Sequence, residues 1–241
     1  MELNIIYMYI GFLLAAYSVI ANDSIQTLGT FLASNKAHFK WYTLWFAASV
    51  MLVYTITYGW LNYDGDISYG RLTRIPFQEV QWYHAAAPAV LLLLTRKGIP
   101  VSTTFLVLSA FASFTVLEKV LMKSIVGYGV AALSAYIIWV VLERYINEKK
   151  DHPEHIKFWR VGQWVTSGWL WFAWLQHDMA NIAVFLPRQL ALGDLMMVLF
   201  STVAILGSVV LTFSPNGLNT VESPLYSTPL PSSPILFTPI T

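Results

Sequence analysis

Residues 3–22 read LNIIYMYIGFLLAAYSVIAN, a run of 20 residues without a charged side chain. A helix needs about 20 mostly apolar residues to cross the hydrocarbon core of a lipid bilayer. This stretch therefore predicts a membrane-spanning helix, and it indicates that lipid is the solvent for much of the chain.

Uncharged runs recur along the whole chain of 241 residues. Six more cover residues 41–63, 80–95, 98–117, 124–142, 161–177 and 195–221. Only 11% of the residues are charged, against about 25% in an ordinary soluble domain. With a mean hydropathy of +0.57, the sequence predicts an all-α integral membrane protein with six to seven hydrophobic segments.

The charge balance limits the kinds of partner. A net charge of +1 excludes a nucleic-acid binder that works by phosphate neutralisation, and the absence of cysteine excludes thiol catalysis and cysteine-ligated metal sites. Assigning the loops alternately to the two membrane sides puts nine of the 14 basic residues on one side: Lys36, Lys40, Arg96, Lys97, Arg144, Lys149, Lys150, Lys157 and Arg160. By the positive-inside rule this side is cytoplasmic, which predicts a multi-pass protein of the plasma or inner membrane with its N-terminus outside.

Two hydrophobic segments carry a carboxylate, which costs a few kcal/mol in a membrane helix and indicates a functional site. Asp23 lies in IANDSIQTLGT (residues 20–30), and Asp178 lies in LQHDMANIA (residues 175–183). Both motifs have a polar residue before the Asp and an amide three residues after it, at a constant offset of 155 residues. The amides, Gln26 and Asn181, share a helix face with their Asp. The alternative is that these side chains only join helices through hydrogen bonds.

An Asp motif at an interrupted helix can bind a small cation together with freed backbone carbonyls. We therefore expect the segments 3–33 and 158–186 to break near residues 22–23 and 177–178. Five spans between the starts of the two motifs would send them through the membrane in opposite directions, as an inverted repeat requires. The sequence thus predicts a first repeat over 1–145, a charged cytoplasmic loop over 146–157, a partial second repeat over 158–213 and a disordered Pro/Ser/Thr-rich tail over 214–241.

A third motif, GIPVSTT, covers residues 98–104. Pro100 suits the first turn of a helix, and Ser102, Thr103 and Thr104 place hydroxyl groups beside unpaired backbone N–H groups. The motif predicts a cradle for an oxyanion, and an ordinary N-cap is the alternative.

Together the three motifs resemble the PiT family of inorganic phosphate transporters, over roughly residues 3–205. In that family two inverted repeats hold phosphate and coupling sodium ions between Asn-Asp motifs and Ser-Thr hairpins. The resemblance implies that Asn22, Gln26, Ser102, Thr103, Thr104 and Asn181 bind the substrate. It also implies that Asp23 and Asp178, with His177 beside them, bind the cation. A complete member would continue beyond residue 213, so this chain is expected to be truncated.

The leading hypothesis is a secondary transporter of a small, phosphate-like oxyanion coupled to sodium or a proton, or an inactive truncated form of one. A non-transporting membrane scaffold and an aspartyl intramembrane protease are the alternatives. The leading hypothesis predicts no enzyme activity and no cofactor except a sodium ion. Its expected partners are the anion, the cation, the bilayer and, in a homodimer, a second copy of the chain.

Three structural expectations follow from the carrier hypothesis. Asp23 and Asp178 should approach each other near the membrane midplane, because a lone carboxylate in lipid is costly. Ser102, Thr103 and Thr104 should lie at a helix start that points into the protein. His177 should make cation coupling sensitive to pH, because an imidazole titrates near neutrality.

Overall fold

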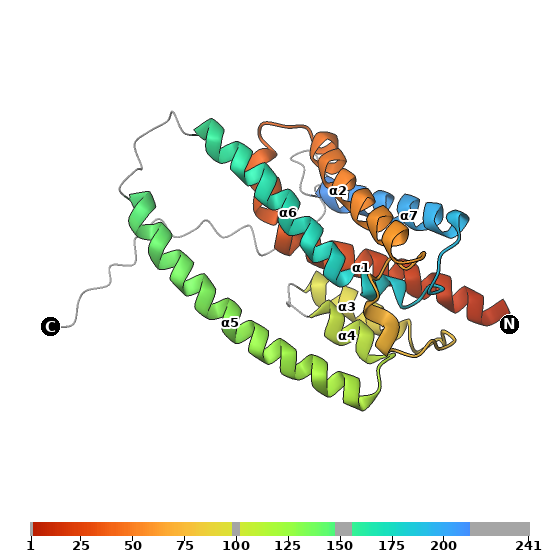
Figure 1. Cartoon of the computed structure of the whole chain (residues 1–241). Coiled ribbons are helices and arrows are strands. Elements are labelled where there is room, and N and C mark those ends of the chain that lie inside the picture. Colours follow the sequence, from red (N-terminus) through yellow and green to blue (C-terminus); the bar gives the residue numbers. More distant parts are fainter. Residues whose placement is uncertain (1, 98–101, 148–155, 213–241) are drawn as a thin grey trace.

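The structure is a computed structural model that describes residues 2–97, 102–147 and 156–212. These residues contain helices and loops but no β-strand (Figure 1). The α-helices are α1 (Glu2–Asn35), α2 (Trp41–Asn62), α3 (Ala86–Arg96), α4 (Thr103–Ser109), α5 (Phe114–Asn147), α6 (Ile156–Ala183) and α7 (Leu192–Thr212), and a short 3₁₀ helix, η1 (Arg71–Arg74), lies between α2 and α3. The predicted all-α class is therefore confirmed for the described residues.

Four helices, α1, α2, α5 and α7, are long and apolar enough to cross a membrane. Each has at least 21 residues, so each reaches the roughly 30 Å of a hydrocarbon core at 1.5 Å per residue. The 28-residue α6 is long enough as well, but its mix of polar residues keeps it outside this apolar group. These are features of a membrane protein.

Fewer helices in the described residues meet this length and apolarity than the six to seven hydrophobic segments expected, and the number of crossings stays a prediction. α3 has 11 residues and α4 has seven, which gives lengths of only about 16 Å and about 10 Å. The two pack against each other. Segments 80–95 and 98–117 therefore do not supply two full crossings, because an uncharged run does not reveal where the backbone turns.

α1 and α6 form the centre of the bundle and run in opposite directions (Figure 1). Near one end, Asn35 Nδ2 donates to Gln163 Oε1 at 3.1 Å. Near the other end, Gly11 faces the ring of Phe185. Early residues of α1 thus meet the residues directly after α6, and this antiparallel pairing brings the two Asp motifs to the same level.

The expected breaks in these helices are absent, so the broken-helix prediction was wrong for both motifs. α1 is continuous through residues 22–23, and α6 is continuous through residues 177–178. Within α1, Thr27 Oγ1 donates to the Asp23 carbonyl oxygen at 2.6 Å, a side-chain bond that an intact helix accommodates. In α6, Asp178 finds side-chain partners on α4, so the backbone there does not have to open.

α2 and α7 pack beside the central pair. Trp45 Nε1 donates to the Val203 carbonyl oxygen at 3.0 Å, and Trp60 Nε1 donates to the Leu190 carbonyl oxygen at 2.8 Å. The second bond holds the end of α2 against the start of α7. The loops 63–85 and 184–191 consequently lie at one end of the bundle, opposite the end where Asn35 contacts α6.

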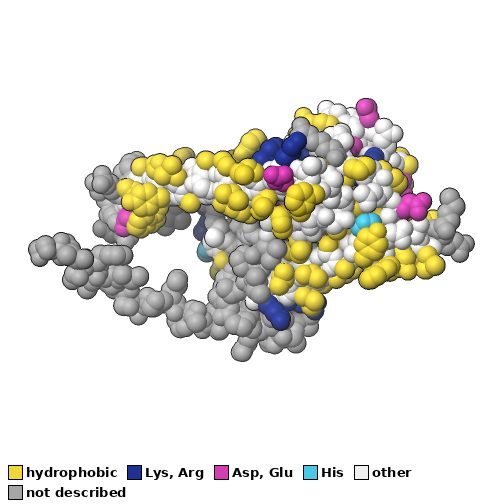
Figure 2. Space-filling model, turned by 90° about the horizontal axis from the view of Figure 1, so that it is seen from below, with side chains coloured by type: hydrophobic (Ala, Val, Ile, Leu, Met, Phe, Trp, Pro, Cys, Tyr) yellow, Lys and Arg dark blue, Asp and Glu magenta, His cyan; other side chains and the backbone are white. Residues whose placement is uncertain are grey.

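α5 stands apart from the bundle in Figure 1 and contacts it mainly through α4. Hydrophobic side chains cover its exposed surface along its length in Figure 2. The span Phe114–Glu143 is apolar with none of its most hydrophobic stretch buried. Such a surface suits lipid. The charged loop predicted over 146–157 and the predicted tail over 214–241 fall largely outside the described residues.

Candidate ion-binding site

Asp23 of α1 and Asp178 of α6 face each other inside the bundle. Asp23 is 1% exposed and Asp178 is 5% exposed. Their carboxyl groups lie within interaction range of each other. The two Asp residues are therefore close to each other, as predicted, because α1 and α6 are antiparallel, but the helix interruptions at which they were expected to cross are absent.

The Asp178 carboxylate is held by three donors. Thr103 Oγ1 donates to Oδ2 at 2.9 Å, and Thr104 Oγ1 donates to Oδ1 at 2.9 Å. Asn181 Nδ2 also donates to Oδ1, at 3.2 Å. A carboxylate oxygen accepts hydrogen bonds, so all three of these groups can donate to Asp178 at the same time.

Asn181 is fully buried and its amide lies at the centre of this network. Its Nδ2 has three acceptors within reach, which are Asp178 Oδ1 at 3.2 Å, Thr103 Oγ1 at 3.2 Å and Thr104 Oγ1 at 3.3 Å. The amide has only two hydrogens, so these contacts share them. Its oxygen, Oδ1, is buried without a hydrogen-bond partner in the described part of the chain.

Asp23 has a poorer set of donors than Asp178. Asn22 Nδ2 donates to Oδ1 at 3.1 Å. The other oxygen, Oδ2, has no hydrogen-bond partner among the described residues, although it is buried. An unsatisfied buried acceptor costs about 1 to 3 kcal/mol, so a ligand that engages this oxygen would be stabilised.

The hydroxyl groups come from the start of α4, as the sequence predicted. Ser102 caps this helix by accepting the Phe105 N–H at 3.3 Å, and Thr103 is only 4% exposed. Thr103 therefore points into the protein, whereas Ser102 is a partly exposed N-cap, so the expected inward position holds for Thr103 alone. The hydroxyl hydrogens of Thr103 and Thr104 go to Asp178 rather than to an open anion cradle. The preceding residues of the motif, 98–101, lie outside the described residues.

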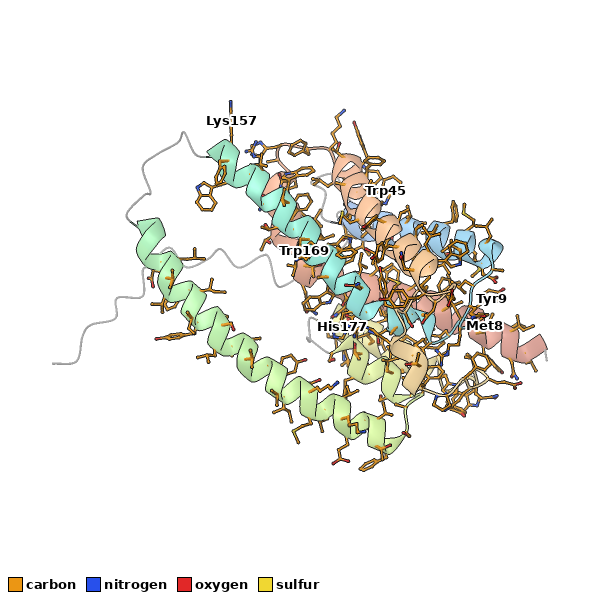
Figure 3. The ribbon with its side chains drawn as sticks, in the orientation of Figure 1. Met8, Tyr9, Trp45, Lys157, Trp169 and His177 are labelled. Carbon is orange, nitrogen blue, oxygen red and sulfur yellow. The ribbon has the colours of Figure 1, made fainter. Side chains whose placement is uncertain are left out.

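Two predicted site residues lie away from the buried network. Gln26 is exposed on α1. His177 is also exposed, with 56% of its side chain accessible, and its Nδ1 lies 3.6 Å from Asp178 Oδ1. Figure 3 shows His177 on α6 at the level of α3 and α4.

No sequence motif pointed to Arg71, which the fold brings to this site. Its Nη1 lies 3.0 Å from His177 Nδ1, across 106 positions in sequence. Arg71 starts the short helix η1 in the loop between α2 and α3. A basic residue in a loop is ordinarily a membrane-flanking charge, so only the tertiary contact reveals this pairing.

Comparisons with known proteins found no relative of this chain. No protein-family model, no curated protein and no solved structure matches it. The resemblance to phosphate transporters rests on the short motifs alone, and the family relation stays a prediction.

Proposed function

We propose that the chain is a secondary carrier in which a small cation binds between Asp23 and Asp178 and moves together with a small oxyanion. The observation that carries the proposal is the pair of facing carboxyl groups, buried at 1% and 5% exposure among long apolar helices. Two oxygens at this pair, Asp23 Oδ2 and Asn181 Oδ1, have no hydrogen-bond partner in the described structure.

The chemistry of these groups fits a hard cation or a proton. Carboxylate, hydroxyl and amide oxygens are the ligands that hard cations prefer. Two facing carboxylates repel each other, and a bound cation or a shared proton relieves that repulsion. The unbroken helices supply no freed carbonyls, so the ligands have to come from the side chains of Asp23, Asp178, Thr103, Thr104 and Asn181.

The phosphate-like anion is proposed from the motif resemblance. Antiparallel helices that carry related motifs allow one half of a bundle to move against the other around a shared site, which is how inverted-repeat carriers give alternating access. The α1–α6 pair has this arrangement. We also propose that the two motifs belong to an inverted repeat.

An aspartyl intramembrane protease is the second candidate, because its mechanism also needs two neighbouring carboxyl groups. Both oxygens of Asp178 already accept hydrogen bonds from Thr103, Thr104 and Asn181. A peptide bond and a water molecule would have to enter between two carboxyls that are almost inaccessible. The geometry therefore favours ion binding.

The test is uptake of radioactive sodium and phosphate by liposomes that contain the whole chain, with imposed sodium or pH gradients. Asp23→Asn and Asp178→Asn each remove one charge with little change in shape, and both should abolish gradient-driven uptake. Asp64→Asn is the matched control, because Asp64 is exposed and has a φ of 49°, a conformation that Asn tolerates. This control should transport like the wild type.

Transport that survives both site substitutions would contradict the carrier proposal. Cleavage of a membrane peptide that disappears in both variants, without ion flux in the wild type, would instead support the protease. A wild-type chain with neither activity, but with normal folding, would favour the scaffold.

A further inference from the structure

We propose that Arg71 and His177 form the oxyanion-binding site of this protein, at the end of α6 and next to the cation pair. This inference rests on the proposed carrier function and deepens it by naming where the anion binds. It starts from one contact, the 3.0 Å approach of Arg71 Nη1 to His177 Nδ1.

That contact fixes which hydrogen-bond donors remain free. A guanidinium group can only donate, so His177 Nδ1 accepts and the neutral ring carries its hydrogen on Nε2. Arg71 uses one of its five N–H donors in this hydrogen bond. The remaining donors of Arg71 and the Nε2–H of His177 belong to two exposed side chains at one place on the surface. Arginine binds oxyanions through two parallel hydrogen bonds, and this suits phosphate or sulfate.

The loop that carries Arg71 is built to hold it in place. Asp66 organises the turn, because its carboxylate accepts hydrogen bonds from the Ser68 N–H at 2.7 Å, from the Gly70 N–H at 3.0 Å and from Ser68 Oγ at 2.8 Å. Tyr69 has a φ of 59°, which is unusual for a bulky residue. Strained backbone of this kind persists where surrounding contacts determine it, and it gathers at functional sites.

Further contacts anchor this turn to the bundle. The Tyr69 hydroxyl donates to the Thr55 carbonyl oxygen of α2 at 2.6 Å. Leu72, within η1, and Ile75, directly after it, are 2% and 5% exposed. The guanidinium of Arg71 is therefore presented to α6 from a fixed platform rather than from a free loop.

The position of this site also explains how anion and cation binding can be coupled. His177 Nδ1 lies 3.6 Å from Asp178 Oδ1, and Asp23 lies close to Asp178. An anion held by Arg71 and His177 would be repelled by these two carboxylates. A cation between the carboxylates cancels part of that repulsion, so each ion should strengthen the binding of the other, as linkage requires.

The experiment measures binding of inorganic phosphate to the purified whole chain by equilibrium dialysis in maltoside micelles, with sodium or with choline. The wild type should bind phosphate about tenfold more tightly in sodium. Arg71→Gln should weaken phosphate binding about tenfold or more in both media. Lys119→Gln, which changes an exposed lysine on α5, should leave it unchanged.

Phosphate binding that Arg71→Gln does not alter would overturn the proposal. If phosphate binding in choline is lost in Thr103→Val or Thr104→Val but kept in Arg71→Gln, the anion site lies at α4 and the proposal is wrong. Arg71-dependent binding without a sodium effect would support the anion site and count against the proposed cation pair, so the two failures are distinguishable.

A lipid phosphate has the same chemistry as the free anion, and a second arm of the experiment separates them. Phosphatidylglycerol is added to the micelles at increasing amounts. Phosphate binding that persists supports a free oxyanion as the ligand. Full displacement by the lipid would overturn the proposal and assign the donors of Arg71 to a headgroup.

Discussion

The two threonines at the start of α4 should differ in their contribution, although both donate to Asp178. Thr103 Oγ1 is the donor to Oδ2, at 2.9 Å, and no other donor reaches that oxygen in the described part of the chain. Oδ1 receives Thr104 Oγ1 at 2.9 Å and also Asn181 Nδ2 at 3.2 Å. Thr103→Val therefore leaves a buried carboxylate oxygen without a partner, whereas Thr104→Val does not.

The size of this difference follows from the strength of such bonds. A hydrogen bond to a charged group contributes about 1.5 to 3 kcal/mol in water-soluble proteins. Side-chain bonds between membrane helices average about 0.6 kcal/mol and reach about 1.7 kcal/mol. We expect Thr103→Val to lower the free energy of unfolding by about 1.5 to 2 kcal/mol, and Thr104→Val by about 0.5 kcal/mol.

The assay is equilibrium unfolding of the purified chain in mixed micelles titrated with a denaturing detergent, followed by tryptophan fluorescence. Thr166→Val is the control, because Thr166 is exposed on α6 and its hydroxyl donates only within that helix, to Gly162 at 2.8 Å and Gln163 at 3.3 Å. It should change stability by less than about 0.5 kcal/mol. Equal losses at Thr103 and Thr104, or the reverse order, would refute the reasoning from the hydrogen-bond network.

Three further predictions test the packing and the loops. Gly11→Ala places a Cβ 2.4 Å from a ring carbon of Phe185 and should cost about 1 to 3 kcal/mol, whereas Gly29→Ala, with nothing within 4 Å, should be neutral or stabilising by up to about 1 kcal/mol; equal effects in thermal unfolding would contradict the close helix contact. Burial lowers the pKa of His84 from 6.5, so the folded state holds it neutral and the unfolded state takes up a proton first. Stability should therefore fall as the pH drops below about 6.5, by at most about 1.4 kcal/mol per pH unit, and His84→Gln should remove this dependence. Asp66→Ala removes the acceptor of three hydrogen bonds and should speed amide hydrogen exchange across residues 66–71, while unchanged protection there would argue against a fixed platform for Arg71.

Much of the candidate site could be predicted from the sequence. A carboxylate within an apolar run is costly in lipid, and this can be recognised from the neighbouring residues alone. Asp23 and Asp178 were recognisable as carboxylates within apolar runs, and their repeated surroundings indicated that they belong together. The GIPVSTT motif predicted a helix start with inward hydroxyls, and Thr103 occupies that place. Its role there, as a donor to Asp178, depends on a contact 75 positions away and has no local signal.

The prediction of broken helices failed for an equally physical reason. A polar motif in an apolar run needs partners, and a broken backbone is one source of them. Neighbouring side chains are another, and they satisfy Asp178 while α6 stays continuous. Sequence reasoning cannot choose between these sources, because the choice depends on which helices lie alongside.

The sequence by itself determined that this is a helical chain with segments suited to lipid. Hydropathy is averaged over consecutive residues, so it does not depend on contacts between distant parts of the chain. It also singled out the carboxylates that lipid would not tolerate alone. The tertiary structure decided that α1 and α6 are antiparallel and continuous, that the short helices α3 and α4 pack against each other, and that Arg71 meets His177 across 106 positions. These features depend on which surfaces pack together, and packing is a property of pairs of distant segments that no local pattern encodes.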